Sequence, residues 1–162
     1  MSVNSYLPHL LVLPEDDANR EMANGFLLDT RVNDRRIQVF PVSGGWLKVI
    51  ENFLKNHVKD MHNFPERRVA LLLDFDDDMV NRSAYVRSQI PPAIGNRVFV
   101  LGVESEPERL KAACNKGFEP IGEALAAECA EDETVLWSHA LLQHNAAELA
   151  RLTADVKPFL FG

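Results

Sequence analysis

Four short apolar runs recur along the chain, each bounded by polar or turn-forming residues. They cover residues 8–14, 36–42, 69–73 and 97–103. The second run alternates between apolar and polar positions, whereas the other three are apolar almost throughout. Short runs that are apolar throughout are typical of strands buried on both faces of a parallel sheet. We therefore predict a strand at each of the four positions.

Segments with helical spacing of apolar residues lie between and after these runs. The clearest covers residues 46–58, where Trp46, Ile50 and Phe53 fall on one face. Further helices are predicted at residues 19–28, 81–89, 107–114, 121–130 and 134–154. Strands that alternate with helices favour βαβ units. The pattern predicts an α/β fold: an open, mostly parallel sheet of about four strands, with helices on both faces and a helical C-terminal region.

The chain of 162 residues has the length of one domain. We place its core at about residues 8–110 and a helical C-terminal extension at residues 111–162. No run of 18 apolar residues is present, which predicts that no segment spans a membrane. The N-terminus has no basic region followed by an apolar stretch, so a cytoplasmic location is expected by default.

The C-terminal region carries both cysteines and an apolar tail. Cys114 and Cys129 have no neighbouring Cys or His in a metal-binding pattern, which predicts free thiols in a reducing compartment. The tail at residues 156–161 is apolar enough to pack on the body of the domain or on a partner chain. A homo-oligomer or a partner protein held by the C-terminal helices and tail is therefore one expectation.

Acidic residues follow the third apolar run without a break. Residues 69–73 give way to Asp74, and three more aspartates, the first of them Asp76, follow Phe75. Because side chains alternate along a strand, Asp74 and Asp76 are expected to point the same way. Two carboxylates at this spacing can share Mg²⁺, which takes one or two carboxylates and keeps several waters. A solvated acidic turn is the alternative.

Two other predicted strands also end in acids. Glu15 follows the first, and Glu104 and Glu106 follow the fourth. The carboxyl ends of parallel strands meet at one edge of a sheet. Ionised carboxylates that converge repel one another unless a cation neutralises them. The pattern favours a site for Mg²⁺ or Mn²⁺ at this edge. Asp16 and Asp17 have a simpler explanation, since acids cap and stabilise a helix N-terminus.

These features resemble a Toprim domain, the metal-dependent fold of topoisomerases, primases and nucleases related to the overcoming-lysogenization-defect (OLD) family. That family has a glutamate at the end of its first strand, commonly before a glycine, and a later D-x-D that closes an apolar strand. Glu15 matches the glutamate, residues 71–76 match the D-x-D strand, and residues 43–45 match a glycine turn. Asp16 replaces the usual glycine, and Asn19 stands where an acid often follows. The match covers residues 8 to about 110.

The resemblance implies Mg²⁺-dependent cleavage or transfer of phosphodiesters in nucleic acid, as in a nuclease. It implies that Asp74 and Asp76 are metal ligands and that Glu15 is a general acid or base, or a further ligand. Glu104 is an additional candidate ligand. Nucleic acid would then be a transient partner, held through the metal.

The formal charge of −7 argues against a sequence-independent coat on nucleic acid, which needs a basic face. A local basic rim around the acids is still conceivable. The candidate arginines are Arg35, Arg36, Arg67, Arg68, Arg82 and Arg87, with plain surface solubility as the alternative.

Two other functions fit part of the pattern. A Toprim-like fold without turnover could serve as a binding or regulatory subunit, because no ATPase or DNA-handling domain is evident in the sequence. A phospho-receiver-like signalling domain would use Asp74 as its phosphoacceptor beside Asp16 and Asp17. Such a domain also needs a lysine after a fifth strand, which is not evident here; Lys157 has the expected neighbours but lies at the end of the chain.

Overall fold

The computed structural model describes residues 2–161 and contains a sheet of four parallel strands in the order β2-β1-β3-β4. The strands are β1 (His9–Pro14), β2 (Ile37–Val39), β3 (Arg67–Asp74) and β4 (Val98–Val103). Leu11 of β1 is in register with Gln38 and Val69, one on each neighbouring strand. The α/β fold with a parallel sheet is confirmed.

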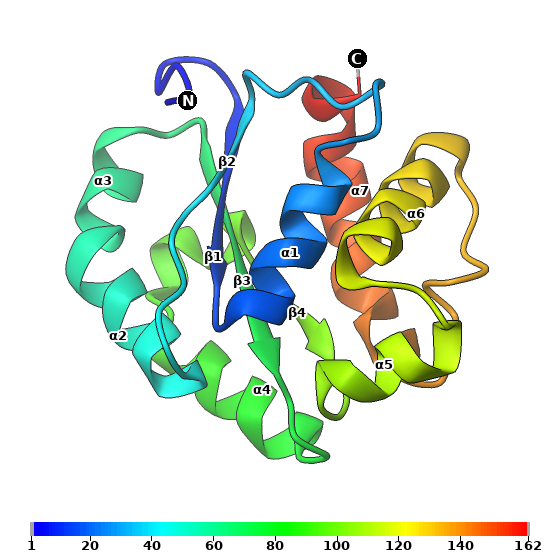
Figure 1. Cartoon of the computed structure of the whole chain (residues 1–162). Helices are drawn as coiled ribbons and strands as arrows, with labels where there is room; N and C mark the ends of the chain where they lie inside the picture. The colour runs from blue at the N-terminus through cyan, green and yellow to red at the C-terminus, as the bar shows by residue number, and fades with distance from the viewer. Residues whose placement is uncertain (1, 162) are drawn as a thin grey trace.

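Helices cover both faces of the sheet (Figure 1). One face carries α2 (Trp46–Asn56), α3 (Val58–Asn63) and α4 (Met79–Gln89). The other carries α1 (Asp17–Phe26), α6 (Phe118–Glu131) and α7 (Ala146–Leu160). The remaining helices of the described residues are α5 (Pro107–Cys114) and two 3-10 helices, η1 (Pro92–Arg97) and η2 (Gln143–Asn145).

The apolar runs form a core on each side of the sheet. Alternate residues of β1 belong to different cores: Leu11 and Leu13 pack toward α2 and α4, and Leu10 and Val12 pack toward α1 and α7. All six residues of β1 are buried, which explains why its sequence is continuously apolar from Leu10 to Pro14 rather than alternating. No helix within residues 2–161 is long and apolar enough to cross a membrane.

The C-terminal region is helical as predicted, but its last helix is displaced along the chain. The helix expected at residues 134–154 instead begins at Ala146 and continues to Leu160. Residues 135–142 form turns and a bend, and the Glu128 carboxylate accepts the backbone N–H groups of Leu136 and Trp137 there. The predicted apolar tail is thus the end of α7, and Leu160 is buried against the sheet. Cys114 and Cys129 are free thiols.

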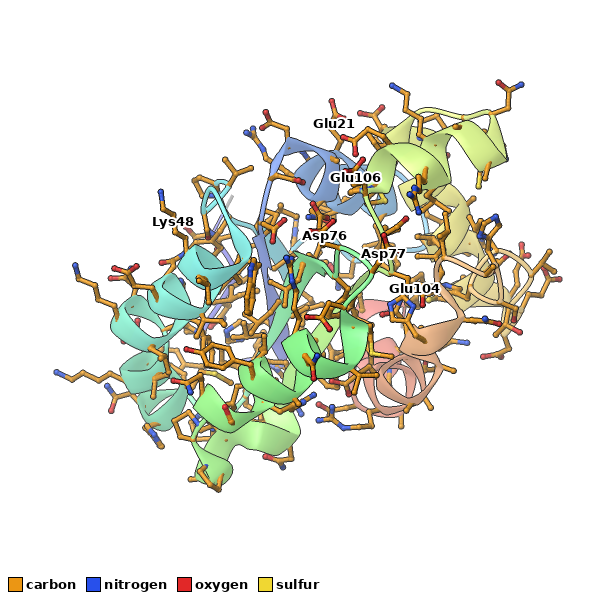
Figure 2. All side chains as sticks on the ribbon, turned by 90° about the horizontal axis from the view of Figure 1, so that it is seen from below. Glu21, Lys48, Asp76, Asp77, Glu104 and Glu106 are labelled. Atoms are coloured by element: carbon orange, nitrogen blue, oxygen red, sulfur yellow. The ribbon has the colours of Figure 1, made fainter. Side chains whose placement is uncertain are left out.

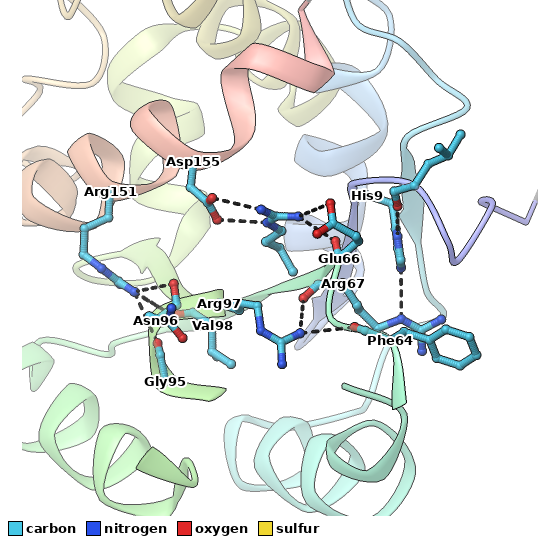
Figure 3. A network of polar contacts seen from close by, with 12 residues as sticks. His9, Phe64, Glu66, Arg67, Gly95, Asn96, Arg97, Val98, Arg151 and Asp155 are labelled. Atoms are coloured by element: carbon cyan, nitrogen blue, oxygen red, sulfur yellow. Dashed lines mark hydrogen bonds and ion pairs between the residues drawn. The ribbon is translucent and has the colours of Figure 1, made fainter. Parts of the chain in front are cut away.

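Arginines gather at the amino ends of the strands, opposite the acids. Arg97 donates to the backbone carbonyls of Phe64 and Arg67 at 3.2 and 2.9 Å (Figure 3). Arg68 binds both carboxylate oxygens of Asp155 on α7, at 3.0 and 3.1 Å. Arg67 and Arg68 begin β3, so they lie at the far end of that strand from Asp74 and cannot form a rim around the acids.

Candidate metal centre

Three carboxylates meet where β1 and β3 end. Glu15, Asp16 and Asp74 each offer an oxygen, and these oxygens lie within 4.8 Å of one another. The strands bring them together because β1 and β3 are neighbours, and the Glu15 N–H extends their ladder by donating to the Leu72 carbonyl at 3.0 Å. The convergence that the sequence predicts for Glu15 and Asp74 is therefore present, with Asp16 as the third member.

Glu15 is the most buried of the three acids. Only 7% of the residue is exposed, and its Oε1 has no hydrogen-bond partner among the described residues. Burial, above all, raises the pKa of Glu15. The glycine turn after β2 holds its backbone, because the Gly44 N–H donates to the Glu15 carbonyl at 2.9 Å. Gly44 has a φ of 91°, a conformation that favours glycine.

Asp16 has two roles at the start of α1. Its Oδ1 accepts the backbone N–H of Asn19 at 3.1 Å, which confirms the predicted helix cap. The same oxygen accepts the Asn19 side-chain amide at 3.1 Å, and that amide nitrogen also donates to Asp74 Oδ1 at 3.1 Å. Asn19 is 1% exposed, so a buried amide ties two carboxylates of the cluster together.

Electrostatic repulsion within the cluster is relieved by a retained proton. Burial, followed by hydrogen bonds and charge repulsion from Asp16 and Glu15, raises the pKa of Asp74 to about 9. Arg82 is near but directed elsewhere: its Nη1 donates to the backbone carbonyl of Asp74 at 2.7 Å, and its Nη2 faces Asp76 Oδ2 at 3.4 Å. The proton that Asp74 retains at neutral pH thus lowers the negative charge gathered at this edge of the sheet.

Asp76 and Glu104 lie near this edge but outside the group of three. Strand β3 ends at Asp74, and both Asp76 and Asp77 have left-handed backbones, with φ of 48° and 60°. The alternation that would align Asp76 with Asp74 therefore stops, and the Asp76 side chain is 60% exposed. Glu104 forms hydrogen bonds through its backbone: its N–H donates to the Leu141 carbonyl, and its carbonyl accepts the Asp77 N–H.

The surface around the cluster is mainly acidic. Figure 2, viewed from below relative to Figure 1, shows Asp76, Asp77, Glu104 and Glu106 on this side of the molecule. Of the arginines considered for a basic rim, Arg82 is the one that contacts a residue of the cluster. Its guanidinium lies over the ring of Trp46 at 4.7 Å from the centroid.

Comparisons of the chain with protein-family models, with curated proteins and with solved structures find no match.

Proposed function

We propose that Glu15, Asp16 and Asp74 bind one divalent cation, Mg²⁺ or Mn²⁺. The observation that carries this proposal is the buried Oε1 of Glu15, which has no partner among the described residues and lies beside two further carboxylates. A buried carboxylate is costly to ionise without compensation. Carboxylate oxygens are the donors that both cations prefer, so the residues present fit such an ion.

We further propose that the chain is a metal-dependent enzyme that cleaves or transfers phosphodiesters in nucleic acid. The resemblance of residues 8–110 to the Toprim pattern supports this, together with the position of the acids at the carboxyl edge of the sheet. Glu15, Asp16 and Asp74 would hold the ion, and the bound ion would polarise a phosphoryl oxygen. Glu15 would move the proton of the attacking or leaving oxygen, since burial brings its pKa closer to neutral pH.

One observation favours a second candidate, a metal-binding subunit without turnover. The acidic surface around the site, which includes Asp76, Asp77 and Glu104, would repel a polyanion unless bound cations neutralise it. No observation of the structure favours the phospho-receiver-like alternative. The lysine considered for it, Lys157, pairs with Asp132 at 2.5 Å, and both lie on the α6 and α7 side.

A combined binding and cleavage experiment tests both candidates. Calorimetry with Mn²⁺ and Mg²⁺ would be run beside cleavage of labelled DNA and RNA, single- and double-stranded, with EDTA as the metal-free control. The matched variants are Glu15→Gln and Glu21→Gln, the latter an exposed position on α1. The enzyme proposal expects metal-dependent cleavage that Glu15→Gln abolishes and Glu21→Gln retains. Metal binding without cleavage favours the second candidate, and no metal binding overturns both.

A further inference from the structure

A cleft of about 620 Å³ opens on the α2–α3 face of the sheet. Its wall includes the N-terminal segment, the chain after β2, and the side chains of Phe40, Asn52, Asn56, His57, Asp60 and Arg67. None of the three carboxylates of the candidate metal centre lines it. A volume of this size is within the range of small-molecule sites.

The cation in this cleft, Arg67, is bound by neutral groups. Arg67 is 9% exposed, and it donates from Nε to His9 Nε2 and from Nη2 to Ser5 Oγ, each at 3.0 Å (Figure 3 shows the His9 contact). Because His9 Nε2 accepts, the ring proton is on Nδ1, which faces the Leu7 carbonyl at 2.7 Å. Burial also lowers the pKa of His9, so the pair has a single positive charge, on Arg67.

The carboxylate nearest to this buried charge compensates it weakly. Asp60 Oδ2 lies 3.6 Å from Arg67 Nη1, beyond hydrogen-bond length, and its side chain is 50% exposed. His57 is buried beside Phe40, and burial lowers its pKa, so it adds no charge of its own at neutral pH. A buried guanidinium is normally paired with an anion that is hydrogen-bonded to it. Nη1 of Arg67, a residue that lines the cleft, has no hydrogen-bond partner among the described residues.

We infer that the cleft binds a small organic anion, a carboxylate or a phosphate monoester, through Nη1 of Arg67. The planar guanidinium suits either group. Phe40 provides an apolar wall for the rest of the ligand. The lining also includes the amides of Asn52 and Asn56, with Asn56 Nδ2 donating to Asn52 Oδ1 at 2.7 Å. This site is separate from the proposed metal centre and does not depend on it.

The test measures binding of benzoate and of phenyl phosphate to the full chain by calorimetry, with benzyl alcohol as the neutral counterpart. Passing all samples over a chelating resin removes metal without adding a competing carboxylate, so neither anion can be held through an ion at the carboxylate cluster. Asp60→Asn removes the competing carboxylate at a half-exposed position. Glu123→Gln, an exposed position on α6, makes the same charge change on the opposite face of the sheet.

We expect at least one anion to bind, benzyl alcohol to bind more weakly, and Asp60→Asn to tighten anion binding by about three- to tenfold relative to Glu123→Gln. The tighter of the two anions identifies the preferred group. The inference is overturned when neither anion binds, when benzyl alcohol binds equally well, or when Asp60→Asn binds no more tightly than Glu123→Gln.

Discussion

Asn145 and Gly102 bind each other through two hydrogen bonds, as neighbouring strands do. The Gly102 N–H donates to Asn145 Oδ1 at 3.1 Å, and Asn145 Nδ2 donates to the Gly102 carbonyl at 2.9 Å. Gly102 lies on β4, at the edge of the sheet, and two residues earlier the Val100 N–H donates to Glu148 Oε1 at 3.0 Å. Side chains from η2 and α7 therefore satisfy an edge that would otherwise be open to pairing with another chain.

Replacing Asn145 with alanine removes both hydrogen bonds and leaves the Gly102 N–H without a partner among the described residues, while the Gly102 carbonyl keeps its contact with His144 Nε2 at 2.7 Å. We expect the free energy of unfolding to fall by about 2–4 kcal/mol, because Asn145 is 3% exposed and buried polar groups without partners are costly. Urea unfolding measures this. Gln143→Ala, an exposed neighbour on η2, should change it by less than about 0.5 kcal/mol. Equal losses in the two variants would show that the edge contact contributes little.

Helices α1 and α6 approach so closely that their glycines cannot carry a side chain. A Cβ on Gly122 would lie 1.9 Å from the Met22 carbonyl oxygen, and one on Gly25 would lie 2.0 Å from the Glu119 carbonyl oxygen. The clashing atoms belong to the backbone, so relief requires the two helices to move apart. This contact fixes α6 against α1, the helix whose N-terminus carries Asp16.

Gly122→Ala tests this close approach. Alanine in a helix normally raises stability by about 1 kcal/mol relative to glycine. Here we expect the opposite sign, a loss of about 2–3 kcal/mol in the free energy of unfolding, because the helices are forced apart. Gly95→Ala is the control, since a Cβ at that position meets no heavy atom of the described chain within 4 Å. A stabilised Gly122→Ala would contradict the packing described above.

The retained proton of Asp74 predicts how stability depends on pH without metal. Its pKa is raised in the folded protein, so above pH 7 the folded state holds a proton that the unfolded chain has released. The free energy of unfolding should therefore fall between pH 7 and 9, by about 1 kcal/mol once solvent screening is allowed for. His9, His57 and His144 have lowered pKa values, so their titration makes the free energy of unfolding rise with pH. This opposite effect is confined to pH below about 6.5 and does not affect the slope between pH 7 and 9.

Urea unfolding in EDTA at pH 7, 8 and 9 measures this slope, with Asp74→Asn as the variant that lacks the titrating group. We expect a shallower slope in Asp74→Asn. Saturating Mg²⁺ should flatten the wild-type slope as well, because a bound cation displaces the proton. A wild-type slope no steeper than that of Asp74→Asn would mean that Asp74 does not hold the proton.

The sheet could be predicted from sequence because burial on both faces leaves a plain signal. The run at residues 69–73 is apolar throughout, and it forms the middle of β3. The continuous helix predicted at residues 46–58 breaks at His57, where α2 ends and α3 follows to Asn63. The amphipathic pattern identifies the buried face, but it does not show where the backbone leaves the helix.

The candidate site was harder to predict, since it depends on where each strand stops. Strand alternation aligns Asp76 with Asp74 only while the backbone stays extended, but Asp76 adopts a left-handed conformation, which aspartate tolerates better than most residues. The sequence identifies Asp16 as a helix cap, which is correct but incomplete. Its place beside Asp74 depends on how α1 leaves β1, and that direction is set by tertiary packing rather than by the local sequence.

Asp16 and Asp76 therefore distinguish the metal site proposed from the structure from the one expected from strand alternation. Asp16→Asn should weaken Mn²⁺ binding by about tenfold or more, because a carboxylate of the cluster is lost. Asparagine caps helices as well as aspartate does, so circular dichroism and urea unfolding should show the fold retained. Asp76→Asn removes an equal charge from an exposed side chain paired with Arg82, and it should change the affinity by less than about twofold. Calorimetry of both variants decides the matter: a larger loss in Asp76→Asn than in Asp16→Asn would assign the ion to Asp74 and Asp76.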